Sequence, residues 1–420
     1  MAIAIFRSIP TPDAWAAARR WRAASLVMAA GVVTVAAGAA AQRVPATRPL
    51  GPVIATARDS FGRVGSVREL SDGRVIVDDP VDHRLLLLDS ALSHAVVIAD
   101  TTGSTSRAYG GGGFTSSPVL RAGGLIAYIG DTTLFVDHTA VALLVIDPAG
   151  TIARVMAPPR PQDIGFVAGS KTAFDGHGHL VYPGQPPARL AGPGIPVEPQ
   201  DSAIRDSQAI VRATMSSTRL DTAAFTRNQR NPSAVWTTAS DGTRAGIQVA
   251  DPLLLFDDWA MTSDGSIAIL RAQNYHIDWV TPDGRVTATP PIAHSWIRLS
   301  DSAKTAIVDS VQHVRDSVRL AGRSLAGLVT QLVAPSALPD YFPPTPAVGL
   351  LADGDNRLWI PQAWLPAGGG TTYDIVDRAG QLVDRVQIPG ATNIVGFGHG
   401  VVYLASRVST RSVLVRARVR

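Results

Sequence analysis

The chain has 420 residues, a formal net charge of +4 and no cysteine. Without cysteine the protein has no disulfide bonds, so packing must stabilise the fold. Residues 1–41 contain four arginines and one aspartate, a net charge of +3, which leaves the remaining chain near +1. The basic character of the whole sequence therefore does not indicate binding to nucleic acid.

Residues 1–41 have the pattern of an export signal. A basic flank ends at Arg22, an apolar stretch runs from Ala23 to Ala40, and small residues precede Gln42 as they do at a signal-peptidase site. We expect a cleaved signal peptide over 1–41 and a periplasmic or secreted protein, not a lipoprotein, because no cysteine is available for lipidation. The alternative is an uncleaved membrane anchor, which the richness in alanine and glycine disfavours. No later apolar run is long enough to span a bilayer.

The rest of the chain repeats one pattern: an apolar run, Asp or Thr, a turn with Gly or Ala, and another apolar run. The pattern occurs at 86–91, 144–150, 279–284 and 375–380. Asp-Gly pairs between alternating apolar runs, as at Asp264-Gly265 and Asp353-Gly354, are strong hairpin signals. Repeated short strands with turns between them are typical of β-propeller blades.

The hairpin signals divide residues 42–420 into repeating units, which we place at about 60–100, 112–158, 164–228, 254–292, 345–389 and 391–420. The last unit is short of one strand, and Val53 to Thr56 can supply it from the N-terminal side. We therefore predict an all-β, six-bladed propeller of four-stranded antiparallel blades, closed into a ring by an N-terminal strand. Five or seven blades remain open alternatives because the spacing is irregular.

Two segments interrupt the strand pattern. Residues 183–206 are rich in Pro and Gly and predict a long excursion inside the third unit. Residues 300–328 predict an inserted amphipathic helix, because Ile307, Val311, Val314 and Val318 recur at helical spacing. We expect its apolar stripe to pack on the propeller, most simply across one mouth of the disc. A helix that binds a partner is the alternative.

Several segments resemble blades of known propellers. Residues 79–89 (DPVDHRLLLLD) are similar to the strand–loop–strand unit of NHL-type repeats, and the glycines at 110–113 resemble the approach to a blade in the same repeats. Residues 259–285 and 351–360 look like units of exported bacterial six-bladed propellers related to the NHL and TolB-like groups. The resemblance implies a propeller and no particular activity, since propellers host enzymes, binding modules and scaffolds alike.

One similar group is enzymatic, the metal-dependent lactonases of the gluconolactonase type. The resemblance implies a divalent cation in the central channel, held by a Glu near the start of the first blade, two Asn and an Asp. Such a cation polarises an ester carbonyl and activates water. This chain departs from that set, because Glu69 lies beside a turn, and Asn274 and Asn393 are its only asparagines near inner positions. A lactone or ester hydrolase that uses calcium or zinc is therefore the alternative function.

The sequence Asp175-Gly176-His177-Gly178-His179 is a candidate metal site. Residues two apart on a strand share a face, so Asp175, His177 and His179 can converge on one ion. The alternative is an ordinary exposed turn, because the Asp-Gly pair coincides with a predicted hairpin and no fourth ligand follows from the spacing.

Trp259 and Trp364 are candidate partner-binding residues, because both are predicted near a mouth of the disc, where an aromatic ring can stack on a sugar or a peptide. Packing between blades is the alternative for both. We assign no catalytic residue: the chain has no G-x-S-x-G motif, and the glycines at 110–113 lack the Lys-Ser/Thr of a phosphate-binding loop.

The sequence thus predicts an exported, monomeric, non-catalytic propeller. We expect it to bind an envelope or extracellular protein, peptide or glycan at one face of the disc, with loops from several blades forming the surface. This function requires no cofactor.

Overall fold

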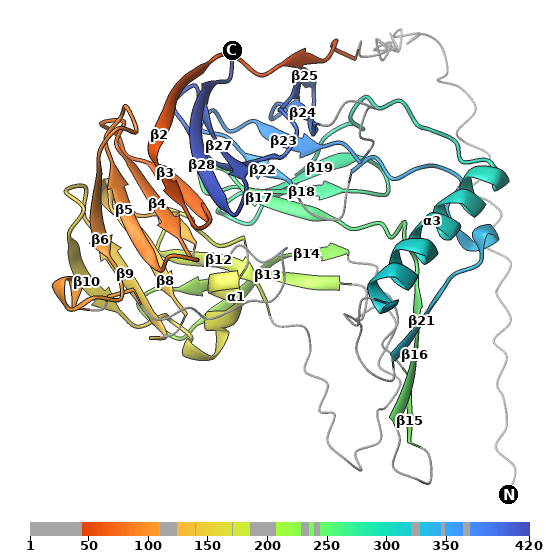
Figure 1. The fold of residues 1–420 in the computed structure, drawn as a ribbon, viewed down its shortest axis with the longest axis horizontal. Coiled ribbons are helices and arrows are strands. Elements are labelled where there is room, and N and C mark those ends of the chain that lie inside the picture. Colours follow the sequence, from red (N-terminus) through yellow and green to blue (C-terminus); the bar gives the residue numbers. More distant parts are fainter. Residues whose placement is uncertain are drawn as a thin grey trace, which may run out of the picture. The chain divides into compact units, whose positions relative to one another are not determined.

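The structure is a computed structural model that describes residues 44–106, 108–109, 124–138, 140–169, 171–184, 207–227, 235–238, 244–320, 328–345, 349–363 and 370–420. Residues 42–420 form one compact unit. Six antiparallel blades, each with a core of four strands, follow one another along this unit, and together they make a six-bladed β-propeller (Figure 1). The predicted fold class and blade number are confirmed.

The first three blades occupy the first half of the unit. Blade 1 consists of β3 (Ser66–Glu69), β4 (Val75–Asp79), β5 (Arg84–Leu88) and β6 (Ala95–Ala99). Blade 2 consists of β7 (Leu125–Ala127), β8 (Thr133–Asp137), β9 (Ala142–Ile146) and β10 (Ile152–Met156). Blade 3 consists of β11 (Ala173–Phe174), β12 (His179–Pro183), β13 (Ser207–Thr214) and β14 (Leu220–Arg227). A short helix, α1 (Ile164–Gly169), precedes blade 3 and packs against β12 and β8.

The last three blades follow in the same order. Blade 4 consists of β17 (Asp258–Met261), β18 (Ile267–Arg271), β19 (His276–Val280) and β20 (Val286–Ala288). Blade 5 consists of β22 (Leu351–Ala352), β23 (Leu358–Pro361), β24 (Thr372–Val376) and β25 (Leu382–Gln387). Blade 6 takes β26 (Thr392–Gly398), β27 (Val401–Val408) and β28 (Arg411–Arg418) from the end of the chain, and its outermost strand is β2 (Val53–Phe61).

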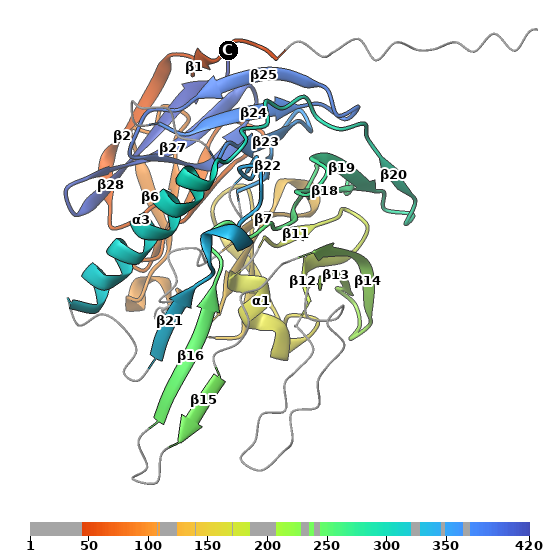
Figure 2. The same ribbon diagram turned by 90° about the vertical axis from the view of Figure 1, so that its right-hand side faces the viewer.

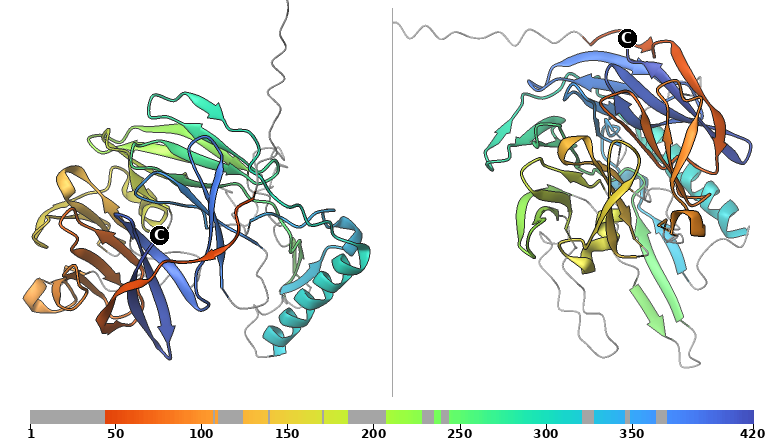
Figure 3. Two further views of the ribbon diagram at one scale, coloured as in Figure 1. Left: turned by 90° about the horizontal axis from the view of Figure 1, so that it is seen from above. Right: turned by 90° about the vertical axis from the view of Figure 1, so that its left-hand side faces the viewer.

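The two ends of the unit are joined in blade 6, as predicted. Strand β2 pairs antiparallel with β28, so that Val53 stands opposite Ala417 and Phe61 opposite Ser412. Both views of Figure 3 show this N-terminal strand against the C-terminal strands. A further short strand, β1 (Arg48–Pro49), pairs parallel with β25 at the edge of blade 5. Closure of this kind leaves the ring without an open end between its first and last blades.

The hydrophobic core is divided into six clusters, one at each junction between neighbouring blades. The alternation of side chains along each strand produces this division. In β18, Ile267 and Ile269 pack toward blade 3, whereas Ala268 and Leu270 pack toward blade 5. The middle strands of a blade are therefore buried on both faces, as in β4, β5, β8 and β9, whereas outermost strands such as β10 and β20 are largely exposed.

The two ends of the ring differ in the length of their connections. We call the end at which the innermost strands begin the loop face, and the opposite end the turn face. Wherever ten or more residues separate consecutive blade strands, the described strand ends on both sides lie at the loop face; the separating residues are 100–124, 157–172, 184–206, 228–257, 289–350 and 362–371. The turn-face connections have six residues or fewer. The predicted excursion within the third unit lies outside the described residues from 185 onward.

Two loop-face connections contribute to one small additional sheet. Strands β15 (Val235–Thr238) and β16 (Arg244–Ala250) come from the connection between blades 3 and 4. Strand β21 (Leu328–Leu332), from the next connection, pairs parallel with β16 (Figure 2). This sheet was not predicted, because its parallel pair joins segments that are far apart in the sequence.

The predicted helix is present as α3 (Asp301–Leu320), in the connection between blades 4 and 5. The buried Lys304 anchors its first turn, because its Nζ donates to Asp340 Oδ1 at 2.8 Å. Among the described elements, the helix packs mainly against the 3-10 turn η6 (Pro335–Ala337), and Val314 remains 59% exposed. Its main contacts thus lie within its own insertion, whereas we expected the apolar stripe to cover a mouth of the disc.

Candidate functional site

A partly buried ion pair joins three blades at the loop face: the side chain of Asp258 is 7% exposed and that of Lys171 is 30% exposed. Lys171, just before β11, donates from Nζ to Asp258 Oδ1 at 2.6 Å, to the Trp259 carbonyl at 3.0 Å and to the Leu350 carbonyl at 2.9 Å. Asp258 Oδ2 accepts the backbone N–H groups of Gly349 and Leu350, each at 2.8 Å. Both charged groups are saturated by internal partners. The arrangement fits a joint between inner strands better than an acid–base pair.

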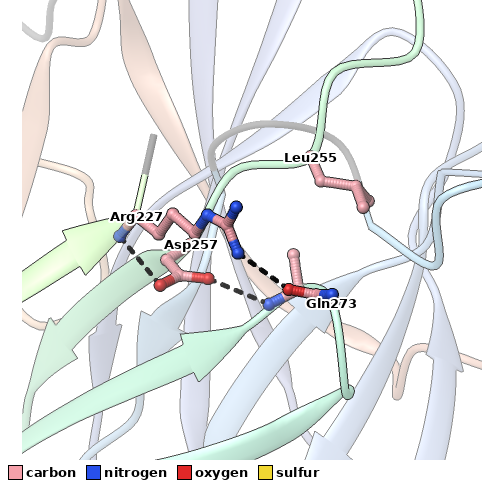
Figure 4. Close-up of a pocket in the computed structure, with 5 residues that line it drawn as sticks. Arg227, Leu255, Asp257 and Gln273 are labelled. Atoms are coloured by element: carbon pink, nitrogen blue, oxygen red, sulfur yellow. Dashed lines mark hydrogen bonds between the residues drawn. The ribbon is translucent and has the colours of Figure 1, made fainter. Parts of the chain in front are cut away.

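A small pocket lies beside this joint, between blades 3 and 4 (Figure 4). It has a volume of about 90 Å³ and is lined by Arg227, Leu255, Asp257, Ala272 and Gln273. Asp257 Oδ2 accepts the backbone N–H of Arg227 at 2.8 Å, and its Oδ1 accepts the N–H of Ala272 at 3.1 Å. The Arg227 side chain reaches across the pocket and donates to Gln273 Oε1 at 2.9 Å.

A row of aromatic rings leads from the core to the surface of the connection between blades 4 and 5. Tyr275 is buried, and its ring lies 5.1 Å from that of His294. The row continues from His294 to Trp296 at 5.2 Å and from Trp296 to Tyr341 at 6.2 Å, with edge-on geometry throughout. Burial and the neighbouring Arg385 lower the pKa of His294 to about 4. His294 is therefore neutral at ordinary pH, which suits its place between two aromatic rings.

The outer end of this row forms an exposed surface that we call the aromatic platform, consisting of Trp296, Arg298 and Tyr341. Trp296 is 45% exposed and Tyr341 is 48% exposed. Arg298 pairs with Tyr341 in an antiparallel bridge, and the hydrogen bonds from Leu299 to Asp340 and from Phe342 to Ile297 flank that bridge. Strand-like pairing thus holds the platform, although both of its segments belong to a long connection.

The structure places the three predicted metal ligands in the tight turn between β11 and β12, on the turn face. Asp175 is buried, and its Oδ1 accepts the backbone N–H groups of His177 and His179. His179 Nδ1 lies 2.7 Å from Asp175 Oδ2, whereas the His177 residue is exposed. Two of the three side chains are thus brought together, and Asp175 stabilises the turn. A metal at this position stays a prediction.

Neither of the two tryptophans predicted to bind a partner belongs to the aromatic platform. Trp259 is 5% exposed and packs in the core cluster between blades 3 and 4 with Val181, Ile210 and Ile269. Its ring is therefore covered by neighbouring blades. Trp364 lies outside the described residues. Trp296 was not selected from the sequence, because no local pattern distinguishes an exposed tryptophan in a connection from a packed one.

Glu69, the residue closest to the lactonase pattern, joins blade 1 to blade 6. Its Oε1 accepts the backbone N–H of His399 at 3.0 Å, and its Oε2 accepts the Tyr403 hydroxyl at 2.5 Å. Asn274 and Asn393 are both exposed. Within the described ranges, no group of three or more His, Asp or Glu side chains lies close enough together to hold a metal ion. No described helix is long and apolar enough to cross a membrane.

Asp78 is a fully buried carboxyl group near the end of β4, where it stands opposite Ser66 of the innermost strand β3. The Tyr109 hydroxyl donates to its Oδ1 at 2.8 Å, and its Oδ2 has no hydrogen-bond partner among the described residues. Burial, together with the nearby charge of Asp79, raises the pKa of Asp78 well above its usual range. The neutral acid is therefore the favoured form in the folded protein.

The chain is a six-bladed β-propeller, and known proteins resemble it in fold. No protein-family model matches the sequence, and no curated protein matches it. A gluconolactonase from Xanthomonas campestris superposes with 13% identity and a TM-score of 0.38, over 89% of this chain and 96% of the gluconolactonase. Virginiamycin B lyase from Staphylococcus aureus superposes with 10% identity and a TM-score of 0.34, over 89% of this chain and 97% of the lyase. Aldose sugar dehydrogenase from Streptomyces coelicolor, in its PQQ-bound form, superposes with 10% identity and a TM-score of 0.37, over 89% of this chain and 99% of the dehydrogenase. At these identities the similarity is one of fold.

Proposed function

We propose that this protein is an exported binding module that holds a polypeptide partner on its loop face, with the aromatic platform as a principal contact. The observation that carries the proposal is the exposure of Trp296 and Tyr341 on the face that bears every long connection. Exposed rings that lie in contact with each other are more typical of interaction sites than single exposed rings, which are ordinary surface.

The composition of the platform favours a polypeptide over a glycan. Tryptophan, tyrosine and arginine are the residues that contribute most often to the binding energy of protein interfaces. The edge-on contact between Trp296 and Tyr341 holds these two rings, and the bridge at Arg298 holds the backbone of both segments, before a partner arrives. Little side-chain entropy is then lost on binding.

The partner is expected in the envelope or outside the cell, because the basic flank, apolar stretch and small residues of 1–41 match an export signal. The saturated Lys171–Asp258 joint supports a non-catalytic role for this part of the loop face, since neither group has a proton or a lone pair to offer a substrate.

The test is capture of partners from an envelope fraction by immobilised full chain. We expect one or more polypeptides to be retained by the wild type and lost with the double variant Trp296→Ala/Tyr341→Ala. Phe225→Ala is the matched control, because Phe225 is 55% exposed on β14 and lies outside the platform. Equal capture by all three proteins, or capture of glycan alone, would contradict the proposal.

The lactonase alternative is tested separately. The purified chain is incubated with calcium or zinc, its metal content is measured by mass spectrometry, and hydrolysis of a sugar lactone is followed. Stoichiometric metal together with metal-dependent hydrolysis would overturn the non-catalytic assignment.

A further inference from the structure

We propose that the pocket between blades 3 and 4 binds a carboxylate group, with Arg227 and Gln273 as its donors (Figure 4). This site is separate from the aromatic platform, and it does not depend on a polypeptide partner. The ligand is a small carboxylic acid or the free C-terminus of a peptide, since the two share the same recognised group.

The first argument is that the side-chain acceptors that line the pocket are already occupied. Asp257 Oδ1 accepts from Ala272, and Asp257 Oδ2 accepts from the Arg227 backbone and from Arg271 Nη1 at 2.7 Å. Gln273 Oε1 accepts from Arg227 Nη1. The donors that remain are the amide N–H groups of Gln273 and the other N–H groups of the Arg227 guanidinium. A site with spare donors and occupied acceptors fits an ionised carboxylate, which only accepts.

The second argument concerns the two arginines. Arg271 is neutralised, because its guanidinium lies 2.7 Å from Asp257 Oδ2 and 2.6 Å from Asp278 Oδ2. Arg227 differs, since no carboxylate of the described residues lies within ion-pair distance of it and its side-chain hydrogen bond goes to the neutral Gln273. An exposed arginine fork that already has one neutral partner is well placed to bind a carboxylate through two parallel hydrogen bonds.

The third argument is that backbone pairing fixes the pocket before a ligand binds. The N–H of Asp257 donates to the carbonyl of Arg227 at 2.8 Å, so the end of β14 and the start of β17 are held together. Leu255 and Ala272 supply an apolar wall for the carbon next to the carboxylate. The volume of about 90 Å³ holds several water molecules, since about 10–15 Å³ is enough for one. It therefore has room for a carboxylate and little more.

Binding is measured by saturation-transfer NMR on the full chain, at constant ionic strength, with three probes. These are acetate, trialanine with a free C-terminus, and trialanine amide. We expect acetate or free trialanine to bind and the amide not to bind, because it lacks the charged group. The variant Arg227→Gln should weaken binding by about tenfold or more, as expected for loss of a charge-assisted hydrogen bond. Arg219→Gln, at the residue just before β14, should bind as the wild type does.

The outcomes separate the two sources. Binding of both carboxylates assigns the pocket to small acids in general, whereas binding of free trialanine alone assigns it to peptide C-termini. Binding of the amide as tightly as the acid, no binding of either acid, or full binding by Arg227→Gln would overturn the proposal. Because Arg227 is exposed, the variant should fold, and an unchanged thermal midpoint confirms that it does.

Discussion

Lys171 and Lys304 are the only lysines of the chain, and both pair with an aspartate, but they serve different purposes. Lys171 meets a carboxylate that is 7% exposed and that holds two further backbone N–H groups, so its charge balances a buried charge. Lys304 meets Asp340, whose side chain is 75% exposed and is well solvated by water. The same residue pair therefore stabilises the protein to different extents at the two places.

This difference gives a prediction for two matched variants. Lys171→Met should lower the free energy of unfolding by about 2–4 kcal/mol, because it leaves Asp258 buried without its counter-charge. Lys304→Met should lower it by about 1 kcal/mol or less. Urea unfolding measures both variants. Equal losses for the two lysines would show that the Lys171 joint does not carry the expected charge balance.

Asp78 gives a prediction about pH. Its pKa is raised in the folded state by burial, so the folded protein retains a proton that the unfolded chain releases above its ordinary value near 3.8. The stability that this group contributes is present below that value and falls as the pH rises toward the raised pKa. Asp78→Asn removes this dependence, since an amide stays neutral. We expect the thermal midpoint of the variant to exceed that of the wild type by a few degrees at neutral pH and to approach it near pH 4.

Asp79 is the control for this measurement. It is also buried, but its carboxylate accepts the backbone N–H groups of Gly62 and Arg63 and pairs with Arg84. Asp79→Asn should therefore lower the midpoint at neutral pH. A lower midpoint for Asp78→Asn as well would mean that Asp78 is ionised in the folded protein.

At the scale of elements, strand β2 shows how closing the ring depends on a few buried side chains. Phe61 is fully buried in the cluster between blades 6 and 1, whereas Val53 at the other end of β2 is 59% exposed. Phe61→Ala should lower the free energy of unfolding by about 3–5 kcal/mol, as large-to-small core substitutions do. Val53→Ala should change it by about 0.5 kcal/mol or less. Denaturant unfolding of the two variants measures the contribution of the closing strand, provided that the dependence of the unfolding free energy on denaturant concentration is the same for both.

The blade strands and the closing strand were predictable because their signals are local. Apolar alternation and Asp-Gly turns recur in every unit, and Val53 to Thr56 follow the same alternation outside the last one. The sheet of β15, β16 and β21 has no such signal: Gly246 pairs with Leu328 across a whole blade. The contacts of the candidate site are equally non-local, since Arg227 and Gln273 meet only when blades 3 and 4 pack. The burial of Trp259 is non-local as well, since it depends on the packing of blades 3 and 4.

At the scale of the whole molecule, the propeller and the two inserted segments 228–256 and 300–339 are stabilised by different contacts. The six core clusters contain no described residue from 228–256 or 300–339. The residues that flank each of these two segments are adjacent. Asp257 N–H donates to the Arg227 carbonyl at 2.8 Å, and Leu299 N–H donates to the Asp340 carbonyl at 2.8 Å. A short linker can therefore replace each segment without straining the blades.

We accordingly expect a chain in which short Gly-Ser linkers replace 228–256 and 300–339 to keep the propeller. Its circular dichroism should retain the β-sheet signal, and its thermal midpoint should fall by a few degrees, because the Lys304–Asp340 pair and the contacts of η6 are lost. A matched deletion of 53–61, which removes the closing strand, should abolish cooperative unfolding instead. If the linker variant also loses cooperative unfolding, the segments 228–256 and 300–339 are needed for the stability of the ring. If both keep a sharp transition, the ring does not depend on its closure, which would contradict the account of β2.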